Sequence, residues 1–404
     1  MNVFIEPSGR LIEPFLDPPG ASPIQGTELY EWQARAFREA GLTVVESPKP
    51  PCLVVPDTVL ITSSGIRRFI EGCAGKNGVL VLKSSVFGDQ TVPVQPHVIP
   101  VDAGWRFEKI RCLYSEGECA DVLFDPEEKI ISMPTPEYYI GISEMKMGIP
   151  KHPVMTLHHW VHILWANQLM GGWEALATPM WKWVVRGLWA AVRSLSVNKW
   201  KVLGKMNVIG RGCDIHHTAV VEGCKIGDGA SIGPHCFVRA STIGAGSTLM
   251  AGAQVELSVL GERCIVTQQT VLKSCVLYPE AVASQYLMQL CVLGRQVVTT
   301  GGAFTMDLNF EGDIRVPLDG ALHSSGQRVL GGAFGHRCRI GTGFWMASGR
   351  MVPNDYFLIR DPSQVLAKLP PDLQDQGPLK VAGRILEPLT LQAPKSQPAA
   401  SEQS

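Results

Sequence analysis

Histidine is the side chain best suited to proton transfer at neutral pH, and this chain of 404 residues contains ten of them. His158 and His162 are four residues apart, so a helix would place both on one face, where they could form a metal-binding pair. No third ligand is evident beside them, and we interpret them as surface or packing residues. The second half of the chain offers four further candidates for acid–base chemistry, which are His216, His217, His235 and His336.

The composition excludes several classes of protein. Lys and Arg number 36 and Asp and Glu 37, which argues against nucleic-acid binding through bulk positive charge. The eleven cysteines include no Cys-x-x-Cys pair, which argues against a zinc site. The first residues lack a basic segment followed by an apolar one, so we expect a cytoplasmic protein with reduced thiols. We find no apolar run long enough to predict a membrane-spanning helix.

The second half of the chain contains a short repeat. From Ile209 onward an aliphatic residue recurs in steps of six, six and five, and this set of three steps then repeats. A glycine often follows the aliphatic residue, as at Gly227 and Gly244. This period predicts a three-sided prism of short strands with the aliphatic side chains inside. The series runs through Ile209, Ile215, Val221, Ile226, Ile232, Val238, Ile243, Leu249, Val255, Leu260, Val266, Leu272 and Leu277.

This pattern resembles the hexapeptide-repeat family, which implies a left-handed parallel β-helix over residues 206–360. The repeat pauses at residues 278–290, where we expect a short helical or looped excursion, and residues 304–328 predict a hairpin insertion. Cysteines at the inward small positions are expected to fill a narrow core. Residues 361–404 are rich in Pro, Gln and Ser, and we expect a tail that is disordered from about residue 380.

The first 150 residues predict alternating strands and helices, and therefore a parallel, three-layer α/β domain. We expect strands over 2–5, 42–46, 52–55 and 79–82. A helix capped by Thr27 is expected to run to about Ala40, where Gly41 stops it, and a second helix, capped by Ser63 or Ser64, is expected to run through Cys73.

Two segments of this domain resemble the sugar-1-phosphate nucleotidyltransferases. They are residues 23–42, which begin Pro-Ile-Gln-Gly-Thr-Glu, and Val54-Val55-Pro56-Asp57-Thr58. The resemblance implies that Asp57 helps to hold Mg²⁺ under the phosphates and that Arg10 belongs to the nucleotide site. A domain of this kind followed by a β-helix is similar to the layout of the bifunctional N-acetylglucosamine-1-phosphate uridyltransferase/glucosamine-1-phosphate acetyltransferase. For Asp57, capping of the next turn is an equally good interpretation.

The sequence departs from that family at the phosphate-binding loop. Family members carry Gly-x-Gly-Thr-Arg, whereas this chain has Pro7-Ser8-Gly9-Arg10-Leu11 and has Ala21-Ser22 where the family has a lysine. Fewer backbone donors and a missing cation leave little to stabilise a phosphate. We therefore predict a degenerate nucleotidyltransferase-like domain.

The hexapeptide acyltransferases resemble one another in using a histidine general base beside an acyl-CoA that lies between subunits. That resemblance implies acetyl-CoA or another acyl-CoA as cofactor and a homotrimer as the assembly. His336, near the insertion, is the first candidate for the base and His235 the second.

A tryptophan-rich helical connector is expected over residues 151–205. Its helix should begin after Thr178-Pro179 and end at about Leu195, with Lys182, Arg186 and Arg193 on one face. A basic helix with tryptophans could lie at a membrane surface, and packing against a domain or a partner is the other interpretation. Seven tryptophans gather in this region: Trp160, Trp165, Trp173, Trp181, Trp183, Trp189 and Trp200.

Two functions remain open at this point. The first is a transferase acting on nucleotide sugars or acyl groups in amino-sugar or envelope polysaccharide metabolism. The second is a non-catalytic regulatory or scaffolding relative that binds a nucleotide sugar or partner proteins, with a membrane surface as one site of action. The degenerate loop favours the second for the N-terminal domain, so whether the chain is an enzyme stays open.

Overall fold

The computed structural model describes the chain except for residues 196–201, 203, 285, 365–378, 383–384 and 389–404. The chain forms two compact units, Met1–Leu358 and Ile359–Ser404. The second unit contains a 3₁₀ turn, Pro362–Gln364, and an antiparallel pair formed by β39 (Leu379–Ala382) and β40 (Ile385–Pro388). These two strands occupy part of the segment for which disorder is predicted, and the rest of that segment lies outside the described residues.

A seven-stranded sheet organises the N-terminal α/β region. Its order is β10-β7-β9-β5-β1-β4, and β8 pairs with β9. β1 is parallel to both of its neighbours, but β9 is antiparallel to β5, β7 and β8. The sheet is therefore mixed, and the prediction of a parallel one is wrong. The strands are β1 (Asn2–Glu6), β4 (Thr43–Val45), β5 (Cys52–Pro56), β7 (Gly78–Lys83), β8 (Val98–Val101), β9 (Gly104–Leu113) and β10 (Ala120–Phe124).

The two predicted helices form where the sequence places them, with different starting residues. Helix α1 (Leu29–Glu39) begins after Glu28, because Thr27 belongs to a hairpin strand and its hydroxyl donates to the Ile24 carbonyl. Gly41 follows the helix with a positive φ of 77°, as expected for a residue that ends it. Helix α2 (Ser63–Cys73) is capped by the Thr62 hydroxyl. The remaining elements are β2 (Pro23–Ile24), β3 (Thr27–Glu28), β6 (Val59–Ile61), β11 (Glu128–Pro134), β12 (Glu144–Pro150), β13 (Val154–Thr156), α3 (Val86–Thr91) and α4 (Glu137–Ile140).

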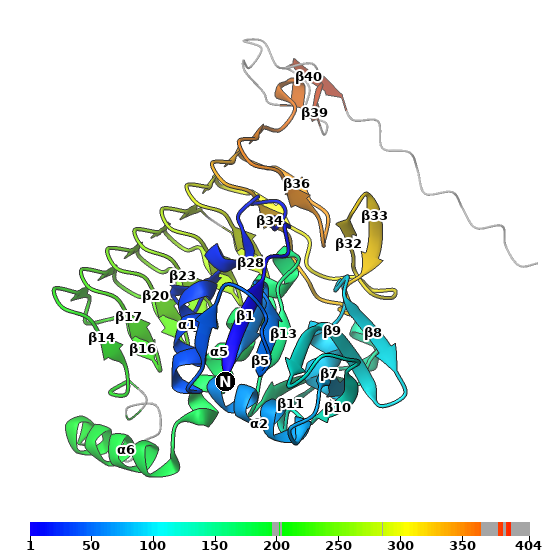
Figure 1. Cartoon of the computed structure of the whole chain (residues 1–404). Coiled ribbons are helices and arrows are strands. Elements are labelled where there is room, and N and C mark those ends of the chain that lie inside the picture. The colour runs from blue at the N-terminus through cyan, green and yellow to red at the C-terminus, as the bar shows by residue number, and fades with distance from the viewer. Residues whose placement is uncertain (196–201, 203, 285, 365–378, 383–384, 389–404) are drawn as a thin grey trace, which may run out of the picture. The chain divides into compact units, whose positions relative to one another are not determined.

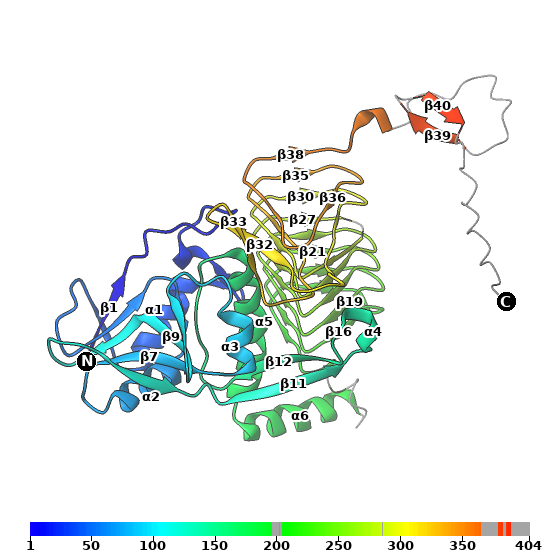
Figure 2. The same cartoon turned by 90° about the vertical axis from the view of Figure 1, so that its right-hand side faces the viewer.

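The tryptophan-rich segment forms two helices of opposite character, α5 (Trp160–Ala177) and α6 (Met180–Ser194). Helix α5 is apolar on most sides, and Trp160, Ile163 and Leu164 are fully buried, as expected for a helix without a polar face. It contacts β2 and β12 of the α/β region and also β26 and β29 of the C-terminal strands (Figure 2). It is therefore part of the core. Trp200 lies outside the described residues.

The C-terminal region, residues 208–358, consists of short parallel strands stacked in three sheets, which is consistent with a β-helix (Figure 1). We call it the strand stack. The first sheet contains β14 (Val208–Ile209), β17 (Lys225–Ile226), β20 (Thr242–Ile243), β23 (Val259–Leu260), β26 (Val276–Leu277), β29 (Val292–Leu293), β34 (Ala333–Phe334) and β37 (Met351–Val352). The second contains β15 (Asp214–Ile215), β18 (Ser231–Ile232), β21 (Thr248–Leu249), β24 (Ile265–Val266), β27 (Val282–Ala283), β30 (Val298–Thr299), β35 (Arg339–Ile340) and β38 (Phe357–Leu358). The third contains β16 (Val220–Glu222), β19 (Phe237–Arg239), β22 (Gln254–Glu256), β25 (Val271–Lys273) and β28 (Leu287–Gln289), and β31 (Phe304–Thr305) pairs with β36 (Trp345–Met346).

The repeat register predicted from the sequence agrees with the pairing. Ile226 pairs with Ile243 and Ile243 with Leu260, and all three side chains are buried. A side chain at Gly244 would collide with the Gly261 carbonyl of the next turn, which explains the glycine after the aliphatic residue. The inward cysteines Cys236, Cys264 and Cys275 are buried, and burial raises the pKa of each thiol, as expected for core filler.

The predicted excursion at residues 278–290 is wrong. The strands β27 and β28 continue the stack through this segment. Val276 pairs with Val259 on one side and with Val292 on the other, so the turn that ends at Val292 is one residue shorter than the turn before it. The predicted hairpin insertion is present as β32 (Arg315–Leu318) paired with β33 (Ala321–Ser324). It begins later than expected, because β31 still belongs to the stack.

Candidate functional site

A small cavity lies at the point where the strand order of the α/β region reverses. The chain passes from β1 to β4 on one side and then crosses to β5 on the other side of β1. In open α/β sheets, ligands bind beyond the carboxyl ends of the strands at such a switch point. Glu6 and Pro56, the last residues of β1 and β5, both line the cavity, which has a volume of about 110 Å³. Its position marks it as the candidate site.

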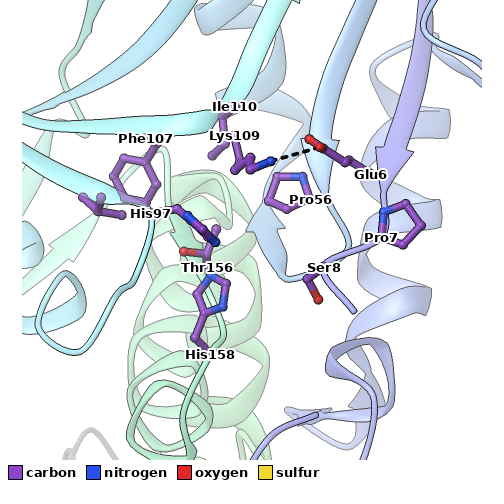
Figure 3. Close-up of a pocket in the computed structure, with 11 residues that line it drawn as sticks. Glu6, Pro7, Ser8, Pro56, His97, Phe107, Lys109, Ile110, Thr156 and His158 are labelled. Atoms are coloured by element: carbon purple, nitrogen blue, oxygen red, sulfur yellow. Dashed lines mark hydrogen bonds and ion pairs between the residues drawn. The ribbon is translucent and has the colours of Figure 1, made fainter. Parts of the chain in front are cut away.

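The walls of the cavity come from five parts of the chain (Figure 3). Phe107 and Ile110 on β9 are buried and supply an apolar wall. An apolar pocket with a few convergent polar groups is the usual form of a small-molecule site. The remaining lining residues are Glu6, Pro7, Ser8, Pro56, His97, Val98, Lys109, Thr156 and His158.

Two ion pairs to a single carboxylate lie at the cavity mouth. The Lys109 ammonium lies 3.0 Å from one Glu6 carboxylate oxygen (Figure 3), and the Arg111 guanidinium lies 3.5 Å from the other. Both cations are partly exposed, so each pair contributes little to stability. The arrangement leaves two cations around one carboxylate, which is a net positive group beside the cavity.

His158 is the buried polar side chain of this site. Burial, with smaller contributions from His162, His97 and Arg10, lowers the pKa of His158 to about 3. Its ring is therefore neutral at physiological pH, and its Nδ1 atom is buried without a hydrogen-bond partner in the structure. An unpaired buried polar atom is costly, so a ligand that pairs with this ring would gain from it.

The neighbouring histidines hold His158 in place. The backbone N–H groups of His158 and His159 both donate to His162 Nδ1 at 3.1 Å. The proton of His162 is therefore on Nε2, which donates to the Pro93 carbonyl at 2.8 Å. Burial lowers the pKa of His159 to about 3 and that of His162 to about 4. His159 and His162 are packing residues, and within the described residues no group of three or more His, Cys, Asp or Glu could hold a metal ion.

Asp57 lies next to the cavity without lining it. Its backbone N–H donates to the Glu6 carbonyl at 3.0 Å, and its Oδ1 atom is buried without a partner. Mg²⁺ held by one or two carboxylates takes substrate phosphates as further ligands. The Asp57 oxygen is enclosed by protein, and the Glu6 carboxylate is engaged by two cations, so these residues do not fit a Mg²⁺ site. We derive no step through a metal ion.

Arg10 points toward the hairpin formed by β32 and β33. Its guanidinium forms an ion pair of 3.4 Å with Asp319, in the turn between β32 and β33. Arg10 is therefore absent from the cavity lining. Its contact joins the loop after β1 to the insertion of the strand stack.

His336 is buried, with 3% of its surface exposed, and both ring nitrogens are engaged. Its Nδ1 accepts from the Arg295 backbone N–H at 2.8 Å, so the proton lies on Nε2 and is donated to Asp17 Oδ2 at 3.0 Å. A ring whose acceptor atom is already used has no free position for a substrate proton. The structure therefore gives His336 a structural role, contrary to the expected general base.

His235 lies at an exposed corner between β18 and β19 with a positive φ of 58°. Its backbone N–H donates to the Thr218 hydroxyl at 2.9 Å. His336 lies at a different corner, between β34 and β35, so the structure does not bring the two predicted histidines into one site.

The loop after β1, residues 7–22, docks on the strand stack. Phe15 is 1% exposed, and its ring centroid lies 4.9 Å from that of Tyr278 and 5.4 Å from that of His336. We call these three rings the aromatic joint. The Asn354 side chain completes it by donating to the Phe15 carbonyl at 2.7 Å. Residues 7–22, the loop that resembles the phosphate-binding loop of the nucleotidyltransferases in position, thus pack against the strand stack.

The same loop offers few backbone donors. Residues 7, 14, 18 and 19 are prolines and have no N–H. The Ile12 and Leu16 amides are used inside the loop, donating to the Asp17 and Ile12 carbonyls. A phosphate cradle requires several N–H groups that converge on one point. The four prolines and these internal bonds reduce the number of N–H groups that the loop can offer a phosphate.

A known family model matches part of the chain. Residues 189–292, about a quarter of the chain, match the family model described as GMPPB C-terminal domain, a hexapeptide-type β-helix domain of sugar nucleotidyltransferases. Comparison with curated proteins gives no match. The match covers the end of α6 and the first turns of the strand stack, and it supports a relationship of that region to the C-terminal domains of sugar nucleotidyltransferases.

Proposed function

We propose that this chain is a nucleotide-sugar transferase-family protein whose N-terminal domain binds a ligand without transferring a nucleotidyl group. The observation that carries this proposal is the cavity at the β1/β5 switch point beside a loop that is docked on the strand stack. The cavity lies where α/β sheets usually bind ligands. The sequence lacks the glycine-rich loop and the lysine that would stabilise a transferred phosphate.

The size of the cavity limits what enters it. A cavity of about 150 Å³ accommodates one benzene molecule, so a cavity of about 110 Å³ takes at most about one ring of a ligand and excludes a whole nucleoside diphosphate sugar. We infer that one ring of the ligand, a sugar or a base, enters between Phe107 and His158. An attached phosphate would lie at the mouth, near Lys109.

The strand stack is part of the proposal. Its regular register and the family match support a left-handed β-helix, and the resemblance to hexapeptide proteins supports a homotrimer. Acyl-CoA binding rests on that resemblance alone, and acetyl-CoA therefore belongs among the ligands to be tested.

A thermal-shift screen tests the binding function. The full chain is melted with UTP, dTTP, UDP-N-acetylglucosamine, a sugar 1-phosphate or acetyl-CoA, each with and without Mg²⁺. Binding to the folded state raises the Tm by mass action, and a ligand at 100 times its Kd adds about 2.7 kcal/mol. We expect a sugar phosphate or a nucleotide to raise the Tm.

Two variants locate the binding site. His97→Ala removes an exposed lining side chain, and Ser8→Trp fills the mouth. Both should abolish the shift. His217→Ala, an exposed histidine of the strand stack, is the matched control and should keep it. No shift with any ligand, or a shift that survives Ser8→Trp, would contradict binding in this cavity.

A further inference from the structure

Helix α6 exposes an apolar face that no other described part of the chain covers. Its outward apolar side chains are 52% to 77% exposed, whereas the large apolar side chains of α5 nearby are buried. Contiguous apolar surface of this kind marks an interaction site in a folded protein. The exposed residues are Met180, Trp181, Val184, Val185, Leu188, Trp189 and Val192.

The helix has three distinct stripes. Successive residues of a helix are rotated by about 100°, so Val184, Leu188 and Trp181 fall together on the exposed face. Ala190 is buried and marks the inner face. In the sequence, Lys182, Arg186 and Arg193 are spaced by four and seven residues, which is the spacing of a third stripe along a helix. A basic stripe along the edge of an apolar one is the pattern of interfacial helices.

The charge around α6 favours an anionic bilayer over a protein as the partner of this face. Residues 175–213 contain seven Lys or Arg and no Asp or Glu, in a chain whose net charge is −1. A protein partner would need a complementary acidic groove, whereas an anionic bilayer offers both the negative charge and the apolar layer. Trp181 and Trp189 have the amphipathic rings that favour the headgroup level of a bilayer. Within the described residues, no helix is long and apolar enough to cross one.

We propose that α6 binds the surface of an anionic lipid bilayer. The apolar stripe enters the boundary between headgroups and acyl chains, and the basic stripe faces the anionic headgroups. The binding anchors the chain peripherally and is independent of the ligand proposed for the cavity. Because each cation near an anionic surface strengthens partitioning about five-fold, binding depends strongly on lipid charge and salt.

Co-flotation of the full chain with lipid vesicles tests the proposal. Vesicles of phosphatidylcholine mixed with phosphatidylserine, in a molar ratio of about two to one, should bind the chain at least ten-fold more tightly than vesicles of pure phosphatidylcholine. Raising NaCl from about 0.1 M to about 0.5 M should weaken that binding, because the shorter Debye length screens the headgroup charge. Absence of binding to the anionic vesicles overturns the proposal, as does equal binding to both.

Three variants assign the binding to α6. Leu188→Asp places a charge in the exposed stripe, and Lys182→Glu reverses one cation without touching that stripe. Each should lower vesicle affinity by at least five-fold. Leu257→Asp, a similarly exposed leucine of the strand stack, should bind like the wild type. Circular dichroism checks that each variant is folded, and binding that neither α6 variant reduces would overturn the assignment.

The other candidate for covering this face is a second copy of the chain. Light scattering without lipid, which measures the oligomeric state, tests that alternative. If Leu188→Asp converts an oligomer into a monomer and the wild type does not bind anionic vesicles, the face is a subunit interface and the bilayer proposal is wrong.

Discussion

Replacing Phe15 with alanine should destabilise the whole Met1–Leu358 unit, because this ring joins the β1 loop to the strand stack. Phe15 is 1% exposed and contacts both Tyr278 and His336. Truncating a buried phenylalanine to alanine costs about 3–5 kcal/mol. For a cooperative unit of this size the unfolding entropy is about 0.75 kcal/mol per kelvin, so the Tm should fall by about 4–7 °C.

Scanning calorimetry and urea unfolding measure the effect. Leu11→Ala is the matched control, because Leu11 is in the same loop and 53% exposed, and its free energy of unfolding should change by about 0.5 kcal/mol or less. In a double-mutant cycle, Phe15→Ala and His336→Ala should show a coupling of about 0.5–3 kcal/mol. If Phe15→Ala costs no more than Leu11→Ala, the loop is not docked as described.

Three further predictions concern the stack, the buried histidines and the assembly. Ile243→Asp puts an unpaired charge into the stack and should cost several kcal/mol, giving an insoluble protein or one without a cooperative melt; an unchanged Tm would refute its inward position. Because the folded pKa of His158 and His159 is about 3, below the unfolded value of 6.5, their stabilisation is present above pH 6.5 and is lost as pH falls toward 3. At pH 5 the loss should be about 2 kcal/mol per histidine by urea unfolding, and equal stability at pH 5 and pH 7 would contradict it. Light scattering at micromolar concentration should give a trimer mass, and a monomer mass would exclude that assembly.

The strand stack could be predicted from the sequence because its signal is local. Each turn repeats the spacing of the last, so Ile226, Ile243 and Leu260 fix the register without knowledge of the rest of the fold. The prediction failed at residues 278–290, where one turn is a residue shorter and the regular spacing no longer matches. The corner of a coil can accommodate one residue fewer. The aliphatic residues then no longer follow the spacing of six, six and five on which the prediction depends.

The candidate site could be predicted only in part because its residues meet through long-range pairing. Lys109 reaches Glu6 because β9 runs antiparallel beside β5, and no nearby residue in the sequence signals that order. His336 contacts Asp17, which is 319 residues away in the sequence. No local pattern around His336 indicates this contact, so its burial could not be predicted from the sequence. The departure from Gly-x-Gly-Thr-Arg, by contrast, is a local feature of residues 7–11 that the sequence shows directly, and the loss of nucleotidyl transfer stays a prediction.

Pyrophosphate release tests the central claim, a ligand-binding domain without nucleotidyl transfer, most directly. The purified full chain is incubated with Mg²⁺, UTP or dTTP and a sugar 1-phosphate, beside an active nucleotidyltransferase as the positive control. We predict no pyrophosphate above background, because the β1 loop is docked on the strand stack and Arg10 is paired with Asp319. Robust turnover that Asp57→Asn abolishes would contradict the account and identify the domain as an active nucleotidyltransferase.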